Sequence, residues 1–182
     1  EWMQEAKQRG LMNLPTLPDA VQYFVSQESI ELFRQHRIFN AQELHARAEV
    51  ALENYCKVLH IEALTMIDMA RKQIVPAAME YTAAVTQLAV GKQNLNLPAE
   101  LERKTITQLS DATEQVALAT EKLEEVTEQR TKKETQQKEA ESFRDTVIPA
   151  MNDLRRTADK LETEVGEKYW PFPVYSDLLF RV

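Results

Sequence analysis

The chain of 182 residues is long enough for one domain with a sizeable hydrophobic core, or for a core with an extended arm. Its 22 basic and 29 acidic residues give a net charge of −7, and no basic run exceeds two residues; one of them, Lys132-Lys133, lies between Glu128 and Glu134. This balance argues against binding to nucleic acid or to anionic membranes. No stretch of the sequence reaches the roughly 20 apolar residues of a membrane span.

Glycine and cysteine are both scarce. A chain with three glycines has no glycine-rich phosphate loop and few tight hairpins, so we predict helices throughout. Gly10, Gly91 and Gly166 each follow a helix-like run, where a left-handed C-terminal cap belongs. Cys56 is alone on an apolar helix face, which excludes a disulfide framework and favours a buried hydrophobic role over a reactive thiol.

The first residues are interpreted as a connection to a preceding domain. Residues 1–9 are typical of the end of a helix that stops at Gly10, and residues 11–18 carry two prolines. The opening lacks the layout of a signal peptide, so we expect a segment of a larger, cytoplasmic protein. The predicted division is a linker at 1–17 and a single helical-bundle domain at 18–182 that ends in an extended tail.

Two short helices are predicted next, at residues 19–25 and 27–36. Pro18 suits the start of the first, and Ser26 suits the N-cap of the second, because its hydroxyl can accept from a free backbone N–H. These helices are expected to cover the first half of the long helix that follows.

The longest predicted helix spans residues 41–90. Asn40 and Glu43 form a variant of the capping box at its start. One apolar stripe runs along a helix of about 75 Å, and Pro76 is expected to bend the helix because the stripe resumes beyond it. The stripe consists of Leu44, Ala48, Leu52, Tyr55, Leu59, Ala63, Met66, Ala70, Ile74, Ala77, Tyr81, Ala84 and Leu88.

Two further long helices are predicted after a loop at residues 91–97. The second spans 98–130 and has an apolar repeat of seven. The repeat turns polar between residues 130 and 137 and then resumes in the same register in a third helix, 136–165. The seam consists of Leu109, Ala112, Val116, Ala119, Leu123 and Val126, then Val147, Met151, Leu154, Ala158, Leu161 and Val165.

The polar interruption allows two interpretations, a hairpin with its tip near residues 130–136 or one continuous helix of more than 60 residues. We favour the hairpin, because a stretch that is polar on all sides gains little from packing, although neither Gly nor Pro marks the tip. The predicted fold is all-α. It is an elongated bundle of three long antiparallel helices, with short N-terminal helices and a docked aromatic C-terminal tail.

Two prolines lie in similar local sequences, Ile74-Val75-Pro76-Ala77 and Val147-Ile148-Pro149-Ala150. Counting residues through an up, down, up bundle places both prolines within about two helical turns of each other along the axis. The first and third helices are then expected to bend together.

The aromatic tail allows two interpretations. Its proline-rich run could bind a peptide-recognition domain, but we favour docking onto the bundle itself. We expect Trp170, Phe172 and Tyr175 to pack beside Leu95 and Leu97 and on the last turns of the first long helix. The tail reads Tyr169-Trp170-Pro171-Phe172-Pro173-Val174-Tyr175, followed by Leu178, Leu179 and Phe180.

Histidine is the first candidate for chemistry. His45 and Glu49 lie four residues apart on one helix face and could contribute to a metal site, but no further ligand completes it. His36 and His60 have no metal-ligand spacing. Exposed decoration of a helix is the favoured interpretation of the His45 and Glu49 pair.

Carboxylates are the second candidate. Glu62 and Asp68 could share one side of the long helix, but without a sign of a pocket we favour a solvated or salt-bridged face. No nucleophile motif, phosphate-binding loop or dinucleotide fingerprint occurs in the sequence. We therefore assign no catalytic, cofactor-binding or metal-binding residue.

Two stretches resemble the C-terminal helical domain of type III glutamine synthetase. The similarity runs from about Pro18 onward, with the tail as its most specific part and residues 98–142 as generic helical sequence. The first stretch is Glu53-Asn54-Tyr55-Cys56-Lys57 with Ile61-Glu62-Ala63-Leu64-Thr65-Met66-Ile67-Asp68-Met69. The second is Ile148-Pro149-Ala150-Met151, Leu154-Arg155, Trp170-Pro171-Phe172-Pro173 and Asp177-Leu178-Leu179-Phe180.

The resemblance implies a parent enzyme that joins ammonia to glutamate with ATP and Mg²⁺ or Mn²⁺. In that family the catalytic barrel lies upstream, and its Asn-Gly-Ser-Gly-type motif has no counterpart in this sequence. The implied partners are the upstream catalytic domain and neighbouring subunits of stacked hexameric rings, with a role in assembly or ring-face packing. The alternative from the residues alone is a free-standing helical scaffold or coiled-coil adaptor.

Overall fold

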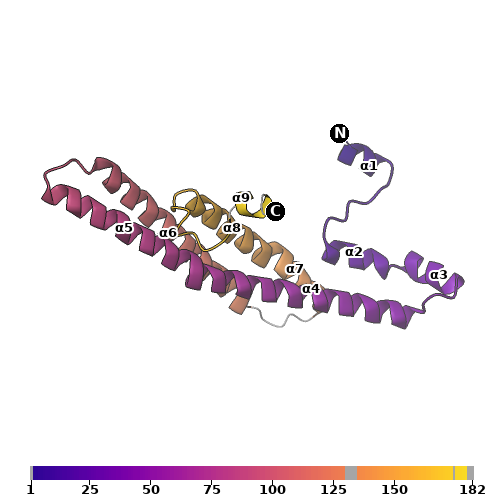
Figure 1. Ribbon diagram of the computed structural model, residues 1–182. Coiled ribbons are helices and arrows are strands. Elements are labelled where there is room, and N and C mark those ends of the chain that lie inside the picture. Colours follow the sequence, from indigo (N-terminus) through magenta and orange to yellow (C-terminus); the bar gives the residue numbers. More distant parts are fainter. Residues whose placement is uncertain (1, 130–134, 174, 180–182) are drawn as a thin grey trace. The chain divides into compact units, whose positions relative to one another are not determined.

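The computed structural model describes residues 2–129, 135–173 and 175–179, and within them it contains helices and no strand. The all-α prediction is therefore confirmed (Figure 1). None of the described helices combines the length and the apolar character needed to cross a membrane. The elements are α1 (Trp2–Gln8), α2 (Leu17–Phe24), α3 (Gln27–Gln35), α4 (Ala41–Met69), the π-helix η1 (Ala70–Ile74), α5 (Val75–Asn94), α6 (Glu100–Glu128), α7 (Gln136–Ser142), the π-helix η2 (Phe143–Val147), α8 (Ile148–Glu162) and α9 (Tyr175–Leu179).

The chain forms two compact units. The first comprises Glu1–Ile61 with Arg130–Ile148, and the second comprises Glu62–Gln129 with Pro149–Val182. The predicted boundary between residues 17 and 18 stays a prediction.

The predicted helix starts in the first unit are confirmed by their caps. The Ser29 N–H donates to Ser26 Oγ at the start of α3. At the start of α4 the capping box closes in both directions, because the Glu43 N–H donates to Asn40 Oδ1 at 2.9 Å and the Asn40 N–H donates to Glu43 Oε2 at 2.8 Å. Leu44, one residue later, is fully buried.

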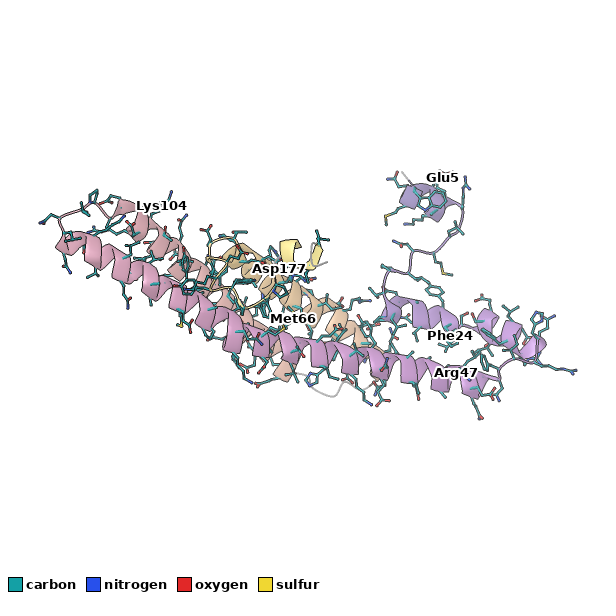
Figure 2. The ribbon with its side chains drawn as sticks, in the orientation of Figure 1. Glu5, Phe24, Arg47, Met66, Lys104 and Asp177 are labelled. Atoms are coloured by element: carbon teal, nitrogen blue, oxygen red, sulfur yellow. The ribbon has the colours of Figure 1, made fainter. Side chains whose placement is uncertain are left out.

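Aromatic side chains hold the short helices of the first unit together. The rings of Phe24 in α2 and Phe33 in α3 meet edge to face at 5.9 Å, and Phe33 lies 5.6 Å from Phe39. The Arg47 guanidinium lies 4.3 Å from the centre of the Phe39 ring. Phe24 and Arg47 mark α2 and α4 in Figure 2, where the helices of this unit carry their side chains.

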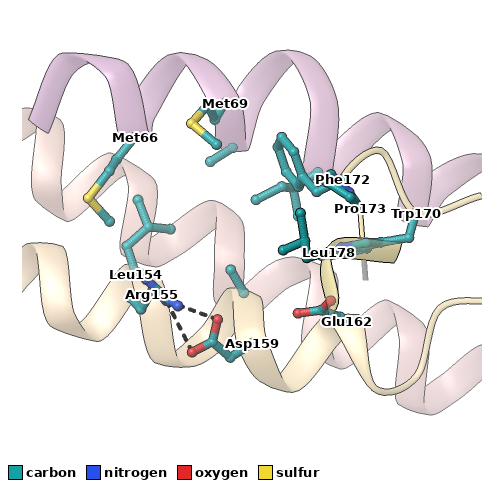
Figure 3. Close-up of a pocket in the computed structure, with 13 residues that line it drawn as sticks. Met66, Met69, Leu154, Arg155, Asp159, Glu162, Trp170, Phe172, Pro173 and Leu178 are labelled. Atoms are coloured by element: carbon teal, nitrogen blue, oxygen red, sulfur yellow. Dashed lines mark hydrogen bonds and ion pairs between the residues drawn. The ribbon is translucent and has the colours of Figure 1, made fainter. Parts of the chain in front are cut away.

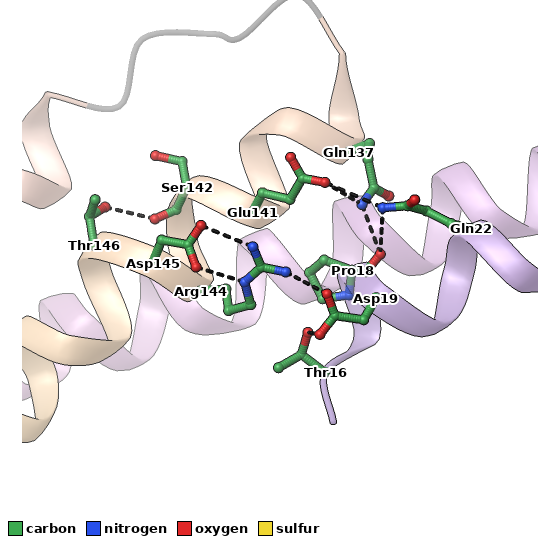
Figure 4. A network of polar contacts seen from close by, with 10 residues as sticks. All are labelled: Thr16, Pro18, Asp19, Gln22, Gln137, Glu141, Ser142, Arg144, Asp145 and Thr146. Carbon is green, nitrogen blue, oxygen red and sulfur yellow. Dashed lines mark hydrogen bonds and ion pairs between the residues drawn. The ribbon is translucent and has the colours of Figure 1, made fainter. Parts of the chain in front are cut away.

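Arg144 in η2 ties two distant parts of the first unit together (Figure 4). Its guanidinium donates two hydrogen bonds to Asp145, at 2.7 and 2.9 Å, and one to Asp19 in α2 at 2.6 Å. The hydrogen bond from Arg144 and its positive charge lower the pKa of Asp145, and the same bond raises the pKa of Arg144. Beside this group, Gln137 Nε2 donates to the Pro18 carbonyl at 2.8 Å, so α7 is fixed to α2.

Both internal prolines follow a π-helix. η1 ends two residues before Pro76, and η2 ends two residues before Pro149. Proline has no N–H and its ring crowds the carbonyl four residues earlier, so a wider turn at this position removes the conflict without ending the helix. A π-helix therefore precedes each proline, and the expected bend of the helix at each proline stays a prediction.

In the second unit, α5 and α6 form an antiparallel hairpin (Figure 1). Lys92 near the end of α5 pairs with Glu102 at the start of α6, and Arg71 in η1 pairs with Glu124 near the end of α6. Between α6 and α8, Lys122 Nζ lies 3.9 Å from the carboxylate of Asp153. The predicted seam faces inward, and its buried members in this unit are Leu109, Ala112, Val116, Leu123, Leu154, Leu161 and Val165.

The polar interruption after the second long helix separates two helices. α6 ends at Glu128, and Thr135 is an extended N-cap whose hydroxyl accepts from the Lys138 N–H. A new helix therefore begins at Gln136, which excludes the continuous helix. The predicted tip at residues 130–136 lies mostly outside the described residues, because 130–134 are not described.

The glycines differ in part from their predicted role. Gly10 has a φ of +74° and ends α1 as expected. Gly91 instead lies within α5, which continues to Asn94, and it is Asn96 that takes the left-handed conformation at φ 54°. Gly166 permits a close approach, because a Cβ there would lie 3.2 Å from the Tyr81 ring.

The prediction that Pro76 and Pro149 lie within about two helical turns of each other along the bundle axis is wrong. In the second unit Gly166 lies beside Tyr81, and Leu154 lies beside Met66. By this register Pro149 is level with about residue 62, which is roughly 20 Å along the helix from Pro76. Counting residues places neighbouring helices level with each other at each connection. The observed position of α8 along the first long helix differs from the counted position by about two to three helical turns.

A pH test follows from the ion pair at the hairpin end. Glu102 is 6% exposed, and the hydrogen bond from Lys92, then the hydrogen bond from a backbone N–H, lower its pKa. A pKa below the unfolded value means that the carboxylate stabilises the fold at neutral pH and that this stabilisation disappears as the pH falls through the folded value. The thermal midpoint of wild type is expected to exceed that of Glu102→Gln near pH 7, and the difference is expected to shrink as the pH falls through the lowered pKa of Glu102.

A matched variant checks the cause of this effect. Glu100→Gln, two residues earlier on an exposed face, keeps the Lys92 pair and is expected to follow the wild-type midpoint across the same pH range. If the thermal midpoints of wild type and Glu102→Gln differ by the same amount from neutral to acid pH, the charge of Glu102 is not the cause of the difference in stability.

Candidate functional site

The chain after α8 folds back onto the second unit. Tyr169 packs on Tyr81 of α5, with ring centres 5.1 Å apart, and Gly166 leaves room for this contact. Trp170 and Phe172 follow, with rings edge to face at 6.1 Å, and both are half-buried. Docking of the tail onto the bundle is confirmed for the described part of the tail.

The docked tail forms one wall of a groove of about 450 Å³ (Figure 3). The opposite wall is the end of α4 and the π-helix η1, and the floor is α8. Most of the lining is apolar, with two methionines and two aromatic rings. The lining residues are Met66, Met69, Ala70, Ile74, Leu154, Arg155, Ala158, Asp159, Glu162, Trp170, Phe172, Pro173 and Leu178.

Three charged side chains of α8 border the groove. Arg155 Nε lies 3.1 and 3.3 Å from the two carboxylate oxygens of Asp159, so these two charges neutralise each other. Glu162 lies one turn further on, and Figure 3 shows its carboxylate on the side of the groove where Trp170 and Leu178 lie. Among the described residues Glu162 has no ion pair. The groove therefore combines an apolar lining with one uncompensated negative charge.

The place where the tail docks differs from the prediction. Leu95 and Leu97 were expected to cover the aromatic side chains, yet they are 71% and 51% exposed. Trp170 and Phe172 instead line the groove that η1 and the end of α4 border from the other side. α8 ends at Glu162, and Gly166, four residues later, lies beside Tyr81, well before the end of α5. The tail therefore folds back toward the middle of the first long helix. The side chain of Tyr175 lies outside the described residues.

The histidine candidates do not assemble into a metal site. His45 and Glu49 are both exposed on α4, and His36 is exposed at the end of α3. His60 is half-buried. Among the described residues no three His, Cys, Asp or Glu side chains gather in a way that could hold a metal ion.

The remaining candidates take structural positions. Glu62 is exposed, and Asp68 pairs with Lys72 one turn later on the surface. Cys56 is 2% exposed, as the favoured interpretation of a buried small side chain requires. The structure therefore places each of these residues in a surface or core role.

The groove contains residues that were not singled out as a site by sequence reasoning. Met66 belongs to the apolar stripe, but Met69 and Glu162 carry no signal in the sequence, because only the register between α8 and the first long helix brings them together. The one available signal was the density of aromatic residues in the tail. That signal indicated docking without indicating where.

These features define a helical domain whose C-terminal tail closes a surface groove. The sequence matches the glutamine synthetase C-terminal domain family over residues 1–93. It is 37% identical to a glutamine synthetase from Butyrivibrio fibrisolvens over 185 residues, which is 100% of this chain and 26% of the relative. It is 32% identical to a type-3 glutamine synthetase from Dictyostelium discoideum over 190 residues, with 99% of the chain and 25% of the relative covered.

The chain belongs to the glutamine synthetase C-terminal domain family. The resemblance to type III glutamine synthetase is thereby confirmed. The chain spans about a quarter of the length of the curated relatives it matches. A third relative, a glutamine synthetase from Bacteroides fragilis, is 30% identical over 186 residues and shows the same proportion, with 26% covered.

Proposed function

We propose that this chain is the non-catalytic C-terminal helical domain of a type III glutamine synthetase and that it contributes to assembly of the enzyme from several subunits. The parent enzyme, a ligase of nitrogen metabolism, joins ammonia to glutamate with ATP and Mg²⁺ or Mn²⁺ in the cytoplasm. Its ATP and metal ions bind upstream of this segment. The family match, and the share of each relative that the chain covers, support this proposal over a free-standing scaffold or coiled-coil adaptor.

The closed end of the α5–α6 hairpin is the observation that carries the assembly role. Several large apolar side chains near this end of the hairpin are exposed, and exposed apolar surface of this kind is typical of an interface. Each of the five side chains here is half exposed or more, and burying them against another subunit removes their apolar area from water. They are Leu88, Val90, Leu95, Leu97 and Leu101.

The test uses the full-length protein from the reading frame that contains this chain. Leu95→Asp with Leu101→Asp places two charges among these exposed apolar side chains. The dissociation constant of the oligomer is expected to rise roughly tenfold or more, so that smaller particles form at a given concentration. Mass photometry across a dilution series measures the shift. Because both side chains are more than 70% exposed, the helical fold of the subunit is expected to survive.

The control is Val50→Asp, which charges a side chain of similar exposure in the first unit. It is expected to leave the oligomer intact. An unchanged oligomer in the hairpin variant would overturn the assembly role of this surface. If the reading frame that contains this chain encodes no upstream synthetase core, the assignment to a parent glutamine synthetase is wrong and the scaffold alternative is favoured.

A further inference from the structure

We propose that the groove between the docked tail and η1 binds a small organic ammonium ion, with Glu162 facing the positive charge and Trp170 and Phe172 enclosing the alkyl groups on the nitrogen. The inference concerns a different surface from the hairpin end and does not rest on the assembly role.

The size and lining of the groove suit a small, largely apolar molecule. Its volume of about 450 Å³ lies within the range of ligand pockets, and its apolar walls come from segments that other contacts already hold in place. Met66 and Met69 form much of the wall opposite the tail. Thioether side chains are flexible and polarizable, so they adapt to the shape of an alkyl chain.

The charge of the groove selects a cation. Arg155 donates its Nε–H to both carboxylate oxygens of Asp159, so these two opposite charges largely cancel and Glu162 determines the net charge of the groove. Glu162, in contrast, has no ion pair among the described residues and lines the apolar part of the site. A carboxylate beside an apolar surface attracts a positive charge more strongly than it does in open water.

The aromatic side chains favour an alkylated nitrogen in particular. Trp170 and Phe172 meet edge to face, so two ring surfaces with different orientations border the same space. The negative face of an aromatic ring attracts a cation, and indole is the strongest of the side-chain rings. A quaternary ammonium group gives up little hydration on entering such a site, whereas a divalent metal ion needs several more oxygen ligands than the groove offers.

The test follows the fluorescence of Trp170 in the 182-residue chain. The chain has two tryptophans, so Trp2→Phe leaves Trp170 as the reporter. Three probes share a six-carbon chain and differ in their head group, namely hexyltrimethylammonium, hexanol and hexanoate. Hexyltrimethylammonium is expected to bind about 3- to 30-fold more tightly than hexanol, the range that one desolvated cation–π contact supplies. Hexanoate is expected to bind most weakly, because its charge repels Glu162.

Two carboxylate variants separate charge from shape. Glu162→Gln keeps the side-chain volume and is expected to remove most of the preference for the ammonium probe over hexanol. Glu164→Gln changes an exposed carboxylate outside the groove and is expected to keep that preference. Circular dichroism of both variants reports whether the helices remain folded.

Two results would overturn the proposal. The first is equal binding of hexyltrimethylammonium and hexanol, which would show a groove that takes any apolar chain. The second is an absence of saturable change up to about 10 mM ammonium probe, a concentration at which even a very weak specific site fills. Either result leaves the assembly role untouched, since that role is read from particle mass.

Discussion

Leu123→Ala is expected to lower the free energy of unfolding by about 3 kcal/mol, because the substitution leaves a cavity in a fully buried position. Leu123 is 0% exposed and lies on the α6 seam near the end of the helix, where the adjacent Glu124 pairs with Arg71 of η1 and Lys122 lies near Asp153 of α8. Urea unfolding followed by circular dichroism measures the change from the shift in midpoint at constant slope.

Leu118→Ala is the matched control for Leu123→Ala. It removes the same atoms from the same helix, but Leu118 is 57% exposed, so its effect is expected to stay within about 0.5 kcal/mol. Equal losses in the two variants would mean that the inner face of α6 is assigned wrongly.

Trp170→Ala is expected to lower the free energy of unfolding by about 2 kcal/mol. The side chain is half-buried against Phe172 and the groove, so it gains less than a fully buried tryptophan, for which about 3–5 kcal/mol is usual. Pro171 and Pro173 limit the freedom of the tail before it docks, which lowers the entropy that docking costs.

Trp2→Ala provides the comparison for Trp170→Ala. Trp2 is 62% exposed in α1 of the first unit, and its removal is expected to leave the unfolding midpoint nearly unchanged. A wild-type midpoint for Trp170→Ala would show that the tail contributes nothing to stability and is free to bind a partner, which is the other interpretation of its proline-rich run.

The helices themselves were predictable because their signals are local. The capping box of Asn40 and Glu43 marks the start of α4 within a residue, and the seven-residue seam marks the inner face of α6. Such signals depend on the spacing of neighbouring residues. They remain readable without any knowledge of what packs against them.

The groove could not be predicted because it depends on the register between helices that are distant in sequence. Met66 and Leu154 meet only because α8 lies where it does along the first long helix, and the sequence carries no mark of that offset. The same uncertainty placed the aromatic tail beside Leu95 and Leu97, two side chains that the structure leaves exposed. Local patterns determine which face packs inward, whereas tertiary contacts determine how far one helix slides along another.

The π-helix η1 changes the directions in which the side chains of α5 point relative to those of α4. A π-helix holds more residues per turn than an α-helix, so five residues in this conformation set the phase of the following helix back by on the order of a quarter turn. The inward faces of α4 and α5 are therefore rotated relative to what an uninterrupted helix would give. A quarter turn is close to the angle of one α-helical residue, so the π-helix absorbs about one extra residue. A chain with one residue fewer between Ala70 and Ile74 could form an uninterrupted α-helix there and still direct Ala77 and Tyr81 toward their present neighbours.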